Sequence, residues 1–290
     1  MVDYPGSFAW YELITTDLAA AETFYRDVVG WAAQDASTPN LAYTLLTAGK
    51  VPLGGVMDLP EEGRKKGAYP RWMGYVEVTD IELTVERIKR LGGAVYVPPT
   101  NTNIGLIAVV ADPQTTTFGL VKGLKSGRRQ PVEPGKPGRV GWHELHAADW
   151  EEAFAFYSEV FGWQKAGTEV SPTVSYQSFS VGGHTIGGMF TKLPEDPLPF
   201  WLFYFNVEDI DTAVERVRIG GGHITADAGE LQNGSWIARC IDPQGATFAL
   251  QGKRGHDSRL GWSTEWKGFS SRGRLLAPRR ARPPGSGQES

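Results

Sequence analysis

The sequence of 290 residues contains a single cysteine, Cys240, which excludes an internal disulfide. Cys240 lies in an apolar, strand-like stretch, so we expect a buried thiol. No window approaches the roughly 18 consecutive apolar residues that a membrane span needs. The opening residues, MVDYPGSFAWYE, also do not resemble a signal peptide, because they lack a basic stretch followed by an apolar one. We therefore expect a cytoplasmic protein with no membrane partner.

The net charge is small, at −4, but it is unevenly distributed. From Arg254 onward there are eight Lys/Arg and three Asp/Glu, a net charge of +5, which leaves −9 on residues 1–253. An acidic body argues against nucleic acid as a partner. Residues 254–290 are rich in Arg, Gly, Ser and Pro and show no hydrophobic period, so we expect a disordered basic tail.

One stretch of the chain occurs twice. Residues 10–31 (WYELITTDLAAAETFYRDVVGW) and 142–163 (WHELHAADWEEAFAFYSEVFGW) match at ten of 22 positions. In both copies alternating apolar and polar residues lead to an Asp, after which apolar residues recur at helical spacing until a Gly. This pattern predicts a strand that leads into a helix, with Asp17 and Asp149 as N-caps.

Further repeats divide the chain into two halves. YVEVTDIELTVERIKRLGG (75–93) aligns with YFNVEDIDTAVERVRIGGG (204–222), and DPQTTTFGL (112–120) aligns with DPQGATFAL (242–250). Each half thus contains two strand-helix units, which predicts an α+β architecture. We place the first domain at 7–123, the linker at 124–138, the second domain at 139–253 and the tail at 254–290.

This arrangement resembles the vicinal oxygen chelate superfamily, which includes glyoxalase I, extradiol dioxygenases and bleomycin-resistance proteins. The resemblance rests on D-x(6)-FY-x(4)-GW after the first strand and on Asp-Pro before the last strand. It is closest to tandem glyoxalase-like proteins, often labelled hydroxylases, that carry W-x-[DE]-L on the first strand of each half. The resemblance implies four βαβββ units that form two glyoxalase-like domains with curved mixed sheets and external helices.

Metal enzymes of that superfamily carry a His seven residues before the helix-capping Asp and a Glu on the strand after the Asp-Pro turn. Neutral residues occupy these positions here: Trp10, Met73, Trp142, Leu202, Gly119 and Ala249. We therefore expect no bound metal and no other cofactor, although a divalent metal with unusual ligands stays open as an alternative.

The repeated W-x-E-L motif supplies the candidate site. Trp10 and Glu12 share one face of a strand because side chains alternate, and so do Trp142 and Glu144. A Trp beside a carboxylate offers stacking area for a flat ligand and one acid-base group. We predict Glu12 and Glu144 as catalytic groups and Trp10, Trp142 and His146 as ligand-binding groups. Alternatively, the Trp residues fill the cup formed by the curved sheet of each half as part of its core, and the Glu residues are solvated at the rim of that cup.

Three functions remain open at this point. The first is a metal-free protein, monomeric or homodimeric, that binds or transforms an aromatic or cationic metabolite, as in drug resistance, sequestration or natural-product tailoring. The second is a metal-dependent glyoxalase-like or dioxygenase-like lyase or oxidoreductase. The third is a non-enzymatic signalling or interaction protein. The sequence leaves open whether the protein is an enzyme.

Overall fold

The computed structural model describes residues 5–65, 67–125, 135–170, 175–194, 196–231 and 233–255. Most of the expected linker and nearly all of the expected tail lie outside these ranges, and the domain boundaries stay predictions. Within the described ranges, no helix is long and apolar enough to cross a membrane.

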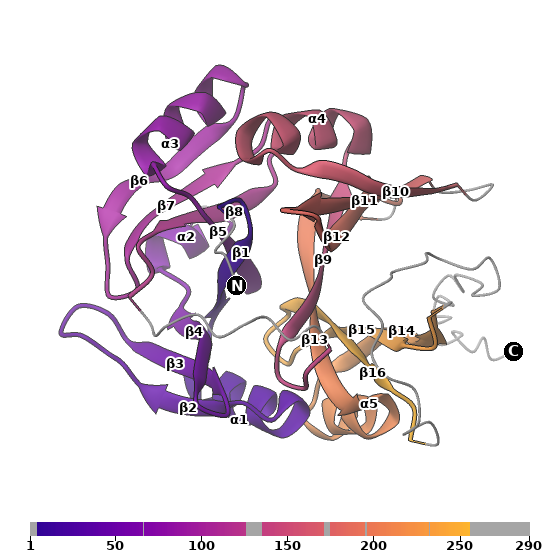
Figure 1. The fold of residues 1–290 in the computed structure, drawn as a ribbon. Coiled ribbons are helices and arrows are strands. Elements are labelled where there is room, and N and C mark those ends of the chain that lie inside the picture. Colours follow the sequence, from indigo (N-terminus) through magenta and orange to yellow (C-terminus); the bar gives the residue numbers. More distant parts are fainter. Residues whose placement is uncertain are drawn as a thin grey trace, which may run out of the picture.

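Each half forms one eight-stranded mixed sheet (Figure 1). The first strand of each half lies near the centre, parallel to a strand of its own unit and antiparallel to the first strand of the next unit. The order in the first sheet is β2 (Ala32–Asp35), β3 (Tyr43–Ala48), β4 (Val51–Asp58), β1 (Phe8–Thr15), β5 (Arg71–Glu77), β8 (Thr117–Lys122), β7 (Leu106–Ala111) and β6 (Ala94–Asn101).

The second sheet repeats this order strand for strand. It runs β10 (Gln164–Val170), β11 (Ser175–Val181), β12 (His184–Thr191), β9 (Val140–Ala147), β13 (Phe200–Asp209), β16 (Thr247–Lys253), β15 (Trp236–Ile241) and β14 (His223–Glu230). The predicted α+β fold of two repeated domains with curved mixed sheets is confirmed.

The four main helices are α1 (Leu18–Val29), α3 (Ile81–Arg90), α4 (Trp150–Phe161) and α5 (Ile210–Ile219). Each begins after an Asp whose carboxylate accepts a backbone N–H of the first turn: Asp17, Asp80, Asp149 and Asp209. Gly30 and Gly162 end α1 and α4 in the left-handed conformation, with φ of 84° and 73°. The predicted caps are therefore confirmed.

The segment 60–70 (PEEGRKKGAYP), a charged stretch between the two units of the first half, contains the short helix α2 (Glu61–Lys65). None of its residues is buried, so it carries no hydrophobic period that the sequence could reveal. Acidic residues in its first turn and basic residues in its last turn favour it through the helix dipole.

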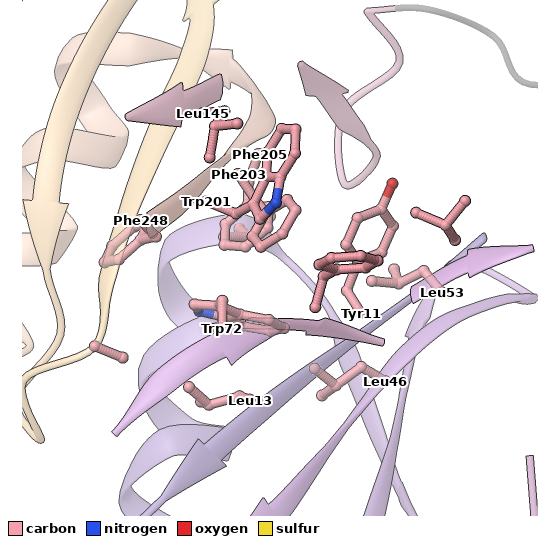
Figure 2. Packing of buried hydrophobic residues seen from close by; sticks show 14 of the residues in the cluster. Tyr11, Leu13, Leu46, Leu53, Trp72, Leu145, Trp201, Phe203, Phe205 and Phe248 are labelled. Atoms are coloured by element: carbon pink, nitrogen blue, oxygen red, sulfur yellow. The ribbon is translucent and has the colours of Figure 1, made fainter. Parts of the chain in front are cut away.

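The helix-bearing faces of the two sheets pack against each other. One continuous core, here called the inter-half cluster, contains Tyr11, Leu13 and Trp72 from the first half with Leu145, Trp201, Phe203, Phe205 and Phe248 from the second (Figure 2). Helix α1 packs against α5, and α3 packs against α4. The opposite face of each sheet is therefore the one that is available for a site.

Residues at matching positions of the two copies of the repeat make equivalent hydrogen bonds at this interface. Tyr25 donates to Asp242 across the halves (3.0 Å), and Tyr157 donates to Asp112 (3.1 Å). Both carboxylates also cap the Asp-Pro turns in which they lie. The indole of Trp31 donates to the Gly138 carbonyl, and that of Trp163 donates to the Gly6 carbonyl. The FY and GW residues of the motif thus join the two halves.

Candidate functional site

The helix-free face of the first sheet carries a second buried cluster, here called the first cup: Trp10, Ile14, Tyr43, Leu59, Met73, Tyr75, Ile104, Ile107 and Val121. Alternation along β1 directs Trp10 and Glu12 into this cup, while Tyr11 and Leu13 enter the inter-half cluster. Glu12 lies among these residues and is only 4% exposed.

Two tyrosines hold the Glu12 carboxyl group. Tyr43 donates to Oε1 (2.8 Å) from β3, and Tyr75 donates to Oε2 (2.5 Å) from β5. The Trp10 indole donates to the Tyr43 hydroxyl (3.1 Å). Glycines make room for the rings, since a Cβ at Gly119 would lie 2.1 Å from the ring of Tyr75.

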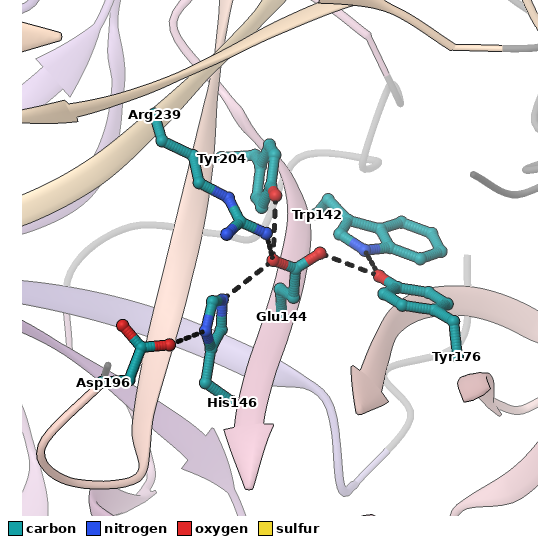
Figure 3. Close-up of polar contacts among 7 residues, drawn as sticks. All are labelled: Trp142, Glu144, His146, Tyr176, Asp196, Tyr204 and Arg239. Carbon is teal, nitrogen blue, oxygen red and sulfur yellow. Dashed lines mark hydrogen bonds and ion pairs between the residues drawn. The ribbon is translucent and has the colours of Figure 1, made fainter. Parts of the chain in front are cut away.

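The second cup repeats this plan: Trp142, Tyr176, Phe190, Leu202, Tyr204, Leu231, Ile237 and Ala249. Glu144 is fully buried there. Tyr176 donates to its Oε2 (3.2 Å), Tyr204 donates to its Oε1 (3.0 Å), and Trp142 donates to the Tyr176 hydroxyl (2.8 Å) (Figure 3). Trp, Glu and two Tyr therefore form the same constellation in both cups.

The second cup adds charged partners. Arg239 donates to Oε1 of Glu144 (2.7 Å), and Nε2 of His146 lies 3.0 Å from the same oxygen. Nδ1 of His146 lies 3.3 Å from Asp196, which is partly exposed. Figure 3 shows the resulting chain of Asp196, His146, Glu144 and Arg239. In the first cup, the repeat places Ile14 at the position of His146.

The first cup also lacks the arginine, because a valine occupies the corresponding position. Val109 pairs with Gly119 in the first sheet as Arg239 pairs with Ala249 in the second. The two cups thus share their aromatic and carboxyl groups, but only the second one places an arginine and a histidine beside the carboxylate.

Because of this difference in charged neighbours, the pKa values of the two carboxyl groups are shifted in opposite directions. Burial raises the pKa of Glu12, and the hydrogen bonds from Tyr75 and Tyr43 only partly offset it. Burial also acts to raise the pKa of Glu144, but the Arg239 guanidinium and the contact with His146 outweigh it and lower the pKa to about 2. The surroundings therefore favour the ionised form of Glu144 and the neutral form of Glu12.

The residues at the superfamily's metal positions do not fit a metal ion. Trp10, Met73, Trp142, Leu202 and Ala249 are members of the two buried cup clusters. In the described ranges, no group of three His, Cys, Asp or Glu could hold a metal. The nearest donors, Glu144 and His146, already bind each other, and the positive charge of Arg239 beside them would repel a cation.

The structure brings all five predicted site residues into the cups: Trp10 and Glu12 into one, and Trp142, Glu144 and His146 into the other. The alternative that the Glu residues are solvated at the rim is wrong, because both are buried. The Trp residues are buried as that alternative expected. The catalytic and ligand-binding roles of these residues stay predictions.

The remaining histidines lie elsewhere. His143 faces the inter-half cluster, where Tyr11 lies 2.6 Å from its Nε2 and the Ile186 carbonyl lies 2.6 Å from its Nδ1. Burial lowers its pKa to about 4, so the ring is neutral, donates through Nδ1 and accepts from Tyr11. His184 and His223 begin β12 and β14, and His256 lies outside the described residues.

Five residues that contact the two carboxyl groups were not predicted from the sequence: Tyr43, Tyr75, Tyr176, Tyr204 and Arg239. Tyr75 and Tyr204 stand at matching positions of the second repeat, which was a usable signal. Tyr43 and Tyr176 lie in less similar segments. Arg239 has no counterpart in the first half, so no repeat could indicate it.

A surface groove of about 1010 Å³ lies between α1 and α5. It is lined by helix residues such as Ala20, Arg26 and Arg216, and none of its lining residues belongs to a cup. It therefore adds nothing to the buried carboxyl groups on the other face of the sheets.

Known proteins support the fold and the repeat. The sequence profile of the Glyoxalase/Bleomycin resistance protein/Dioxygenase superfamily matches residues 7–119 and again 139–250. The chain belongs to this superfamily. Among solved members, a dioxygenase for 2,2',3-trihydroxybiphenyl from Sphingomonas wittichii aligns with a TM-score of 0.63 at 13% identity, covering 86% of this chain and 91% of that one. The manganese-bound glyoxalase of Novosphingobium aromaticivorans aligns with a TM-score of 0.61 at 13% identity, covering 87% and 83%.

Two superfamily members resemble the whole chain in sequence. The putative glyoxylase CFP32 of Mycobacterium tuberculosis is 27% identical over 252 residues, which is 84% of this chain and 94% of that protein. The anthracycline biosynthesis protein DnrV of Streptomyces peucetius is 28% identical over 260 residues, which is 85% of this chain and 93% of that protein. A manganese-bound relative exists in this superfamily, but among the residues that the structure describes the cups hold no group of three His, Cys, Asp or Glu that could bind a metal.

Proposed function

We propose that the protein binds a small planar aromatic metabolite in its cups without a metal ion and that Glu12 transfers a proton to or from this ligand. The observation that carries the proposal is the constellation of a buried carboxyl group, two tyrosines and a tryptophan, which occurs in both cups. Two relatives named as anthracycline biosynthesis proteins favour a polycyclic aromatic ligand.

The division of roles follows from the charges. Burial raises the pKa of Glu12 and so favours its protonated form, which makes Glu12 the acid-base group of this proposal. Glu144 is held as a carboxylate by Arg239, so it positions groups of the second cup and does not exchange a proton. Aromatic side chains of each cup supply stacking area for the ligand.

Access to the cup requires movement. Trp10 is fully buried, and Tyr43 and Tyr75 are 1% and 2% exposed. A ligand therefore enters between these rings, and its own rings replace their contacts. This requirement favours a flat and largely apolar ligand, because a charged one would lose its hydration without a partner.

The test is a titration with planar aromatic probes, followed by calorimetry, on wild type and on two paired variants. Trp10→Ala with Glu12→Gln should abolish saturable binding in the first cup, and Trp142→Ala with Glu144→Gln should abolish it in the second. Glu82→Gln, on the exposed side of α3, is the control and should bind as wild type does. Binding that survives both paired variants would place the ligand outside the cups.

The second candidate function is sequestration of the ligand without a reaction. Measuring both binding and turnover distinguishes it from the first. Glu12→Gln alone should retain binding and remove the proton-transfer reaction, because glutamine keeps the shape of the neutral carboxyl group but cannot exchange its protons. If the wild-type protein binds a small molecule extracted from the protein's native host and does not convert it, the protein is a sequestration protein.

A further inference from the structure

Two buried amides lie side by side in the second cup. Asn206 on β13 and Gln251 on β16 are register partners in parallel strands. They follow Tyr204 and Ala249 by two residues, and both of these belong to the second cup. Phe205, between Tyr204 and Asn206, enters the inter-half cluster instead. Alternation therefore directs both amides to the cup side of the sheet.

Their hydrogen-bonding atoms lack partners. Asn206 is 0% exposed and Gln251 is 7% exposed. In the part of the chain that the structure describes, neither Oδ1 nor Nδ2 of Asn206 has a hydrogen-bond partner, and neither does Oε1 of Gln251. Buried polar groups are normally paired, because losing water without a replacement partner is unfavourable.

Another amide of the same sheet is satisfied, which sets these two apart. Gln177 on β11 is also 0% exposed. Its side-chain nitrogen donates to the carbonyl oxygens of Gly167 and Ser178, and its oxygen accepts from Thr168. The open amide of Gln244 lies in the turn after β15, so on the described strands of this sheet the open amide atoms belong to Asn206 and Gln251.

The surroundings make room for the pair. A Cβ at Gly141 would lie 2.2 Å from Oδ1 of Asn206, so glycine at this position leaves the space that the amide uses. Across the sheet, Gln251 pairs with Ile237, one row along from the pair of Ala249 and Arg239. A ligand that reaches Tyr204 and Arg239 therefore lies next to the amides.

The first cup has different chemistry at this place. The register partners there are Glu77 and Val121, which occupy the positions of Asn206 and Gln251. The amide pair is thus a feature of the second cup alone.

We propose that Asn206 and Gln251 form a hydrogen-bonding subsite of the second cup that takes a neutral hydroxyl group beside a carbonyl oxygen on a planar ligand. The two amide oxygens accept from ligand hydroxyls, and Nδ2 of Asn206 donates to the ligand carbonyl. A neutral group fits because the open atoms carry no net charge. This inference rests on the proposed function, since the ligand is the same planar aromatic molecule.

The test uses the full chain and two probes, 1,2-dihydroxyanthraquinone and 9,10-anthraquinone, which lacks the hydroxyl groups. Side-chain amide signals of Asn206 and Gln251 and the indole signal of Trp10 are followed by nuclear magnetic resonance. The amide signals are assigned through Asn206→Leu and Gln251→Met, which keep side-chain volume. Calorimetry on wild type and variants gives the preference for the hydroxylated probe.

The expected result is that the hydroxylated probe shifts both amide signals and binds wild type roughly tenfold more tightly than anthraquinone, as about two added hydrogen bonds allow. Asn206→Leu should lose this preference and still bind anthraquinone. Glu77→Gln, the matched change in the first sheet, should keep the preference. The thermal midpoint of Asn206→Leu without ligand should not fall, because no hydrogen bond within the protein is lost.

The indole signal of Trp10 reports on the first cup, and the two amide signals report on the second. Shifted amides with an unchanged Trp10 indole would support the subsite and overturn the role of the first cup. A shifted indole with unchanged amides would overturn the subsite and leave the proposed function standing. Unchanged signals from both would overturn both. A lower thermal midpoint for Asn206→Leu with the preference retained would show that the amides hold only a structural water, which also overturns the subsite.

Discussion

At the residue scale, the two carboxyl groups of the cups show how neighbours decide the state of a buried acid. Glu12 and Glu144 share strand position, burial and two tyrosine donors. Only Glu144 has Arg239 and His146 beside it, and only its pKa is lowered. Neutralising the two residues should therefore have unequal effects on stability.

We expect Glu144→Gln to lower the free energy of unfolding by about 3 kcal/mol at pH 7, because the largely buried charge of Arg239 loses its partner. Glu12→Gln should change it by less than about 1 kcal/mol, since burial already favours the neutral acid. Urea unfolding of both variants measures the difference. Equal losses would contradict the asymmetry of the cups.

His143 predicts how stability depends on pH. Its pKa of about 4 in the folded protein lies below the ordinary value of 6.5. Between these values the unfolded chain takes up a proton that the folded protein does not, so stability falls as the pH is lowered from 6.5 to 4. The loss should approach about 3 kcal/mol at pH 4.

Carboxyl groups with shifted pKa values also contribute at these pH values, so the comparison is made with a variant. The difference in unfolding free energy between wild type and His143→Gln should shrink as the pH falls from 7 to 4.5. A constant difference between wild type and His143→Gln would show that folding does not change the pKa of His143.

At the scale of elements, the hydrophobic period and the caps of the chain predicted most strands and helices correctly. The almost unbroken apolar run PFWLFYFNV (199–207) is typical of a strand buried on both faces, and β13 is buried on both. The sequence could not show what each face contacts. One side of β13 enters the inter-half cluster and the other enters the second cup, and only the three-dimensional arrangement separates these surroundings.

A partner from the other half also alters a predicted cap. The D-x-x-E spacing of Asp149 and Glu152 is typical of a reciprocal capping box. Asp149 does accept the backbone N–H of Glu152, but its own N–H donates to the side chain of Gln114 from the first half. Local spacing thus predicted the helix start and not the tertiary partner that completes it.

The tyrosines of α1 and α4 should contribute equally to stability because their contacts are equivalent. Tyr25→Phe leaves Asp242 without its tyrosine donor, and Tyr157→Phe does the same to Asp112. Each should cost about 1–3 kcal/mol of unfolding free energy, the range for a buried acceptor that loses its partner. Tyr69→Phe, at a half-exposed ring, should be neutral. A loss in only one of the two variants would indicate that the halves are not joined symmetrically.

At the scale of the whole molecule, the repeat predicted two domains with one sheet each, but not that their helix-bearing faces form one core. The inter-half cluster contains residues of both halves, and the motif residues Tyr25, Trp31, Tyr157 and Trp163 all bind across it. Repeats show that two units are alike and do not show how the units pack. The fold was therefore predictable, while the interface and the asymmetry of the cups were not.

This shared core predicts that the halves do not unfold independently. Separation would expose Trp72, Phe203 and Phe205, which are at most 4% exposed in the whole chain, and their loss of burial would remove a large part of the marginal stability of a domain of this size. Residues 1–123 and 139–290, expressed separately, should each be aggregated or partly unfolded by circular dichroism, and mixing them should restore a soluble 1:1 complex. The full chain should show one cooperative unfolding transition when followed by tryptophan fluorescence and by circular dichroism. Two separate transitions, or two halves that are each stably folded as monomers, would show that the inter-half cluster is only a contact between independent domains.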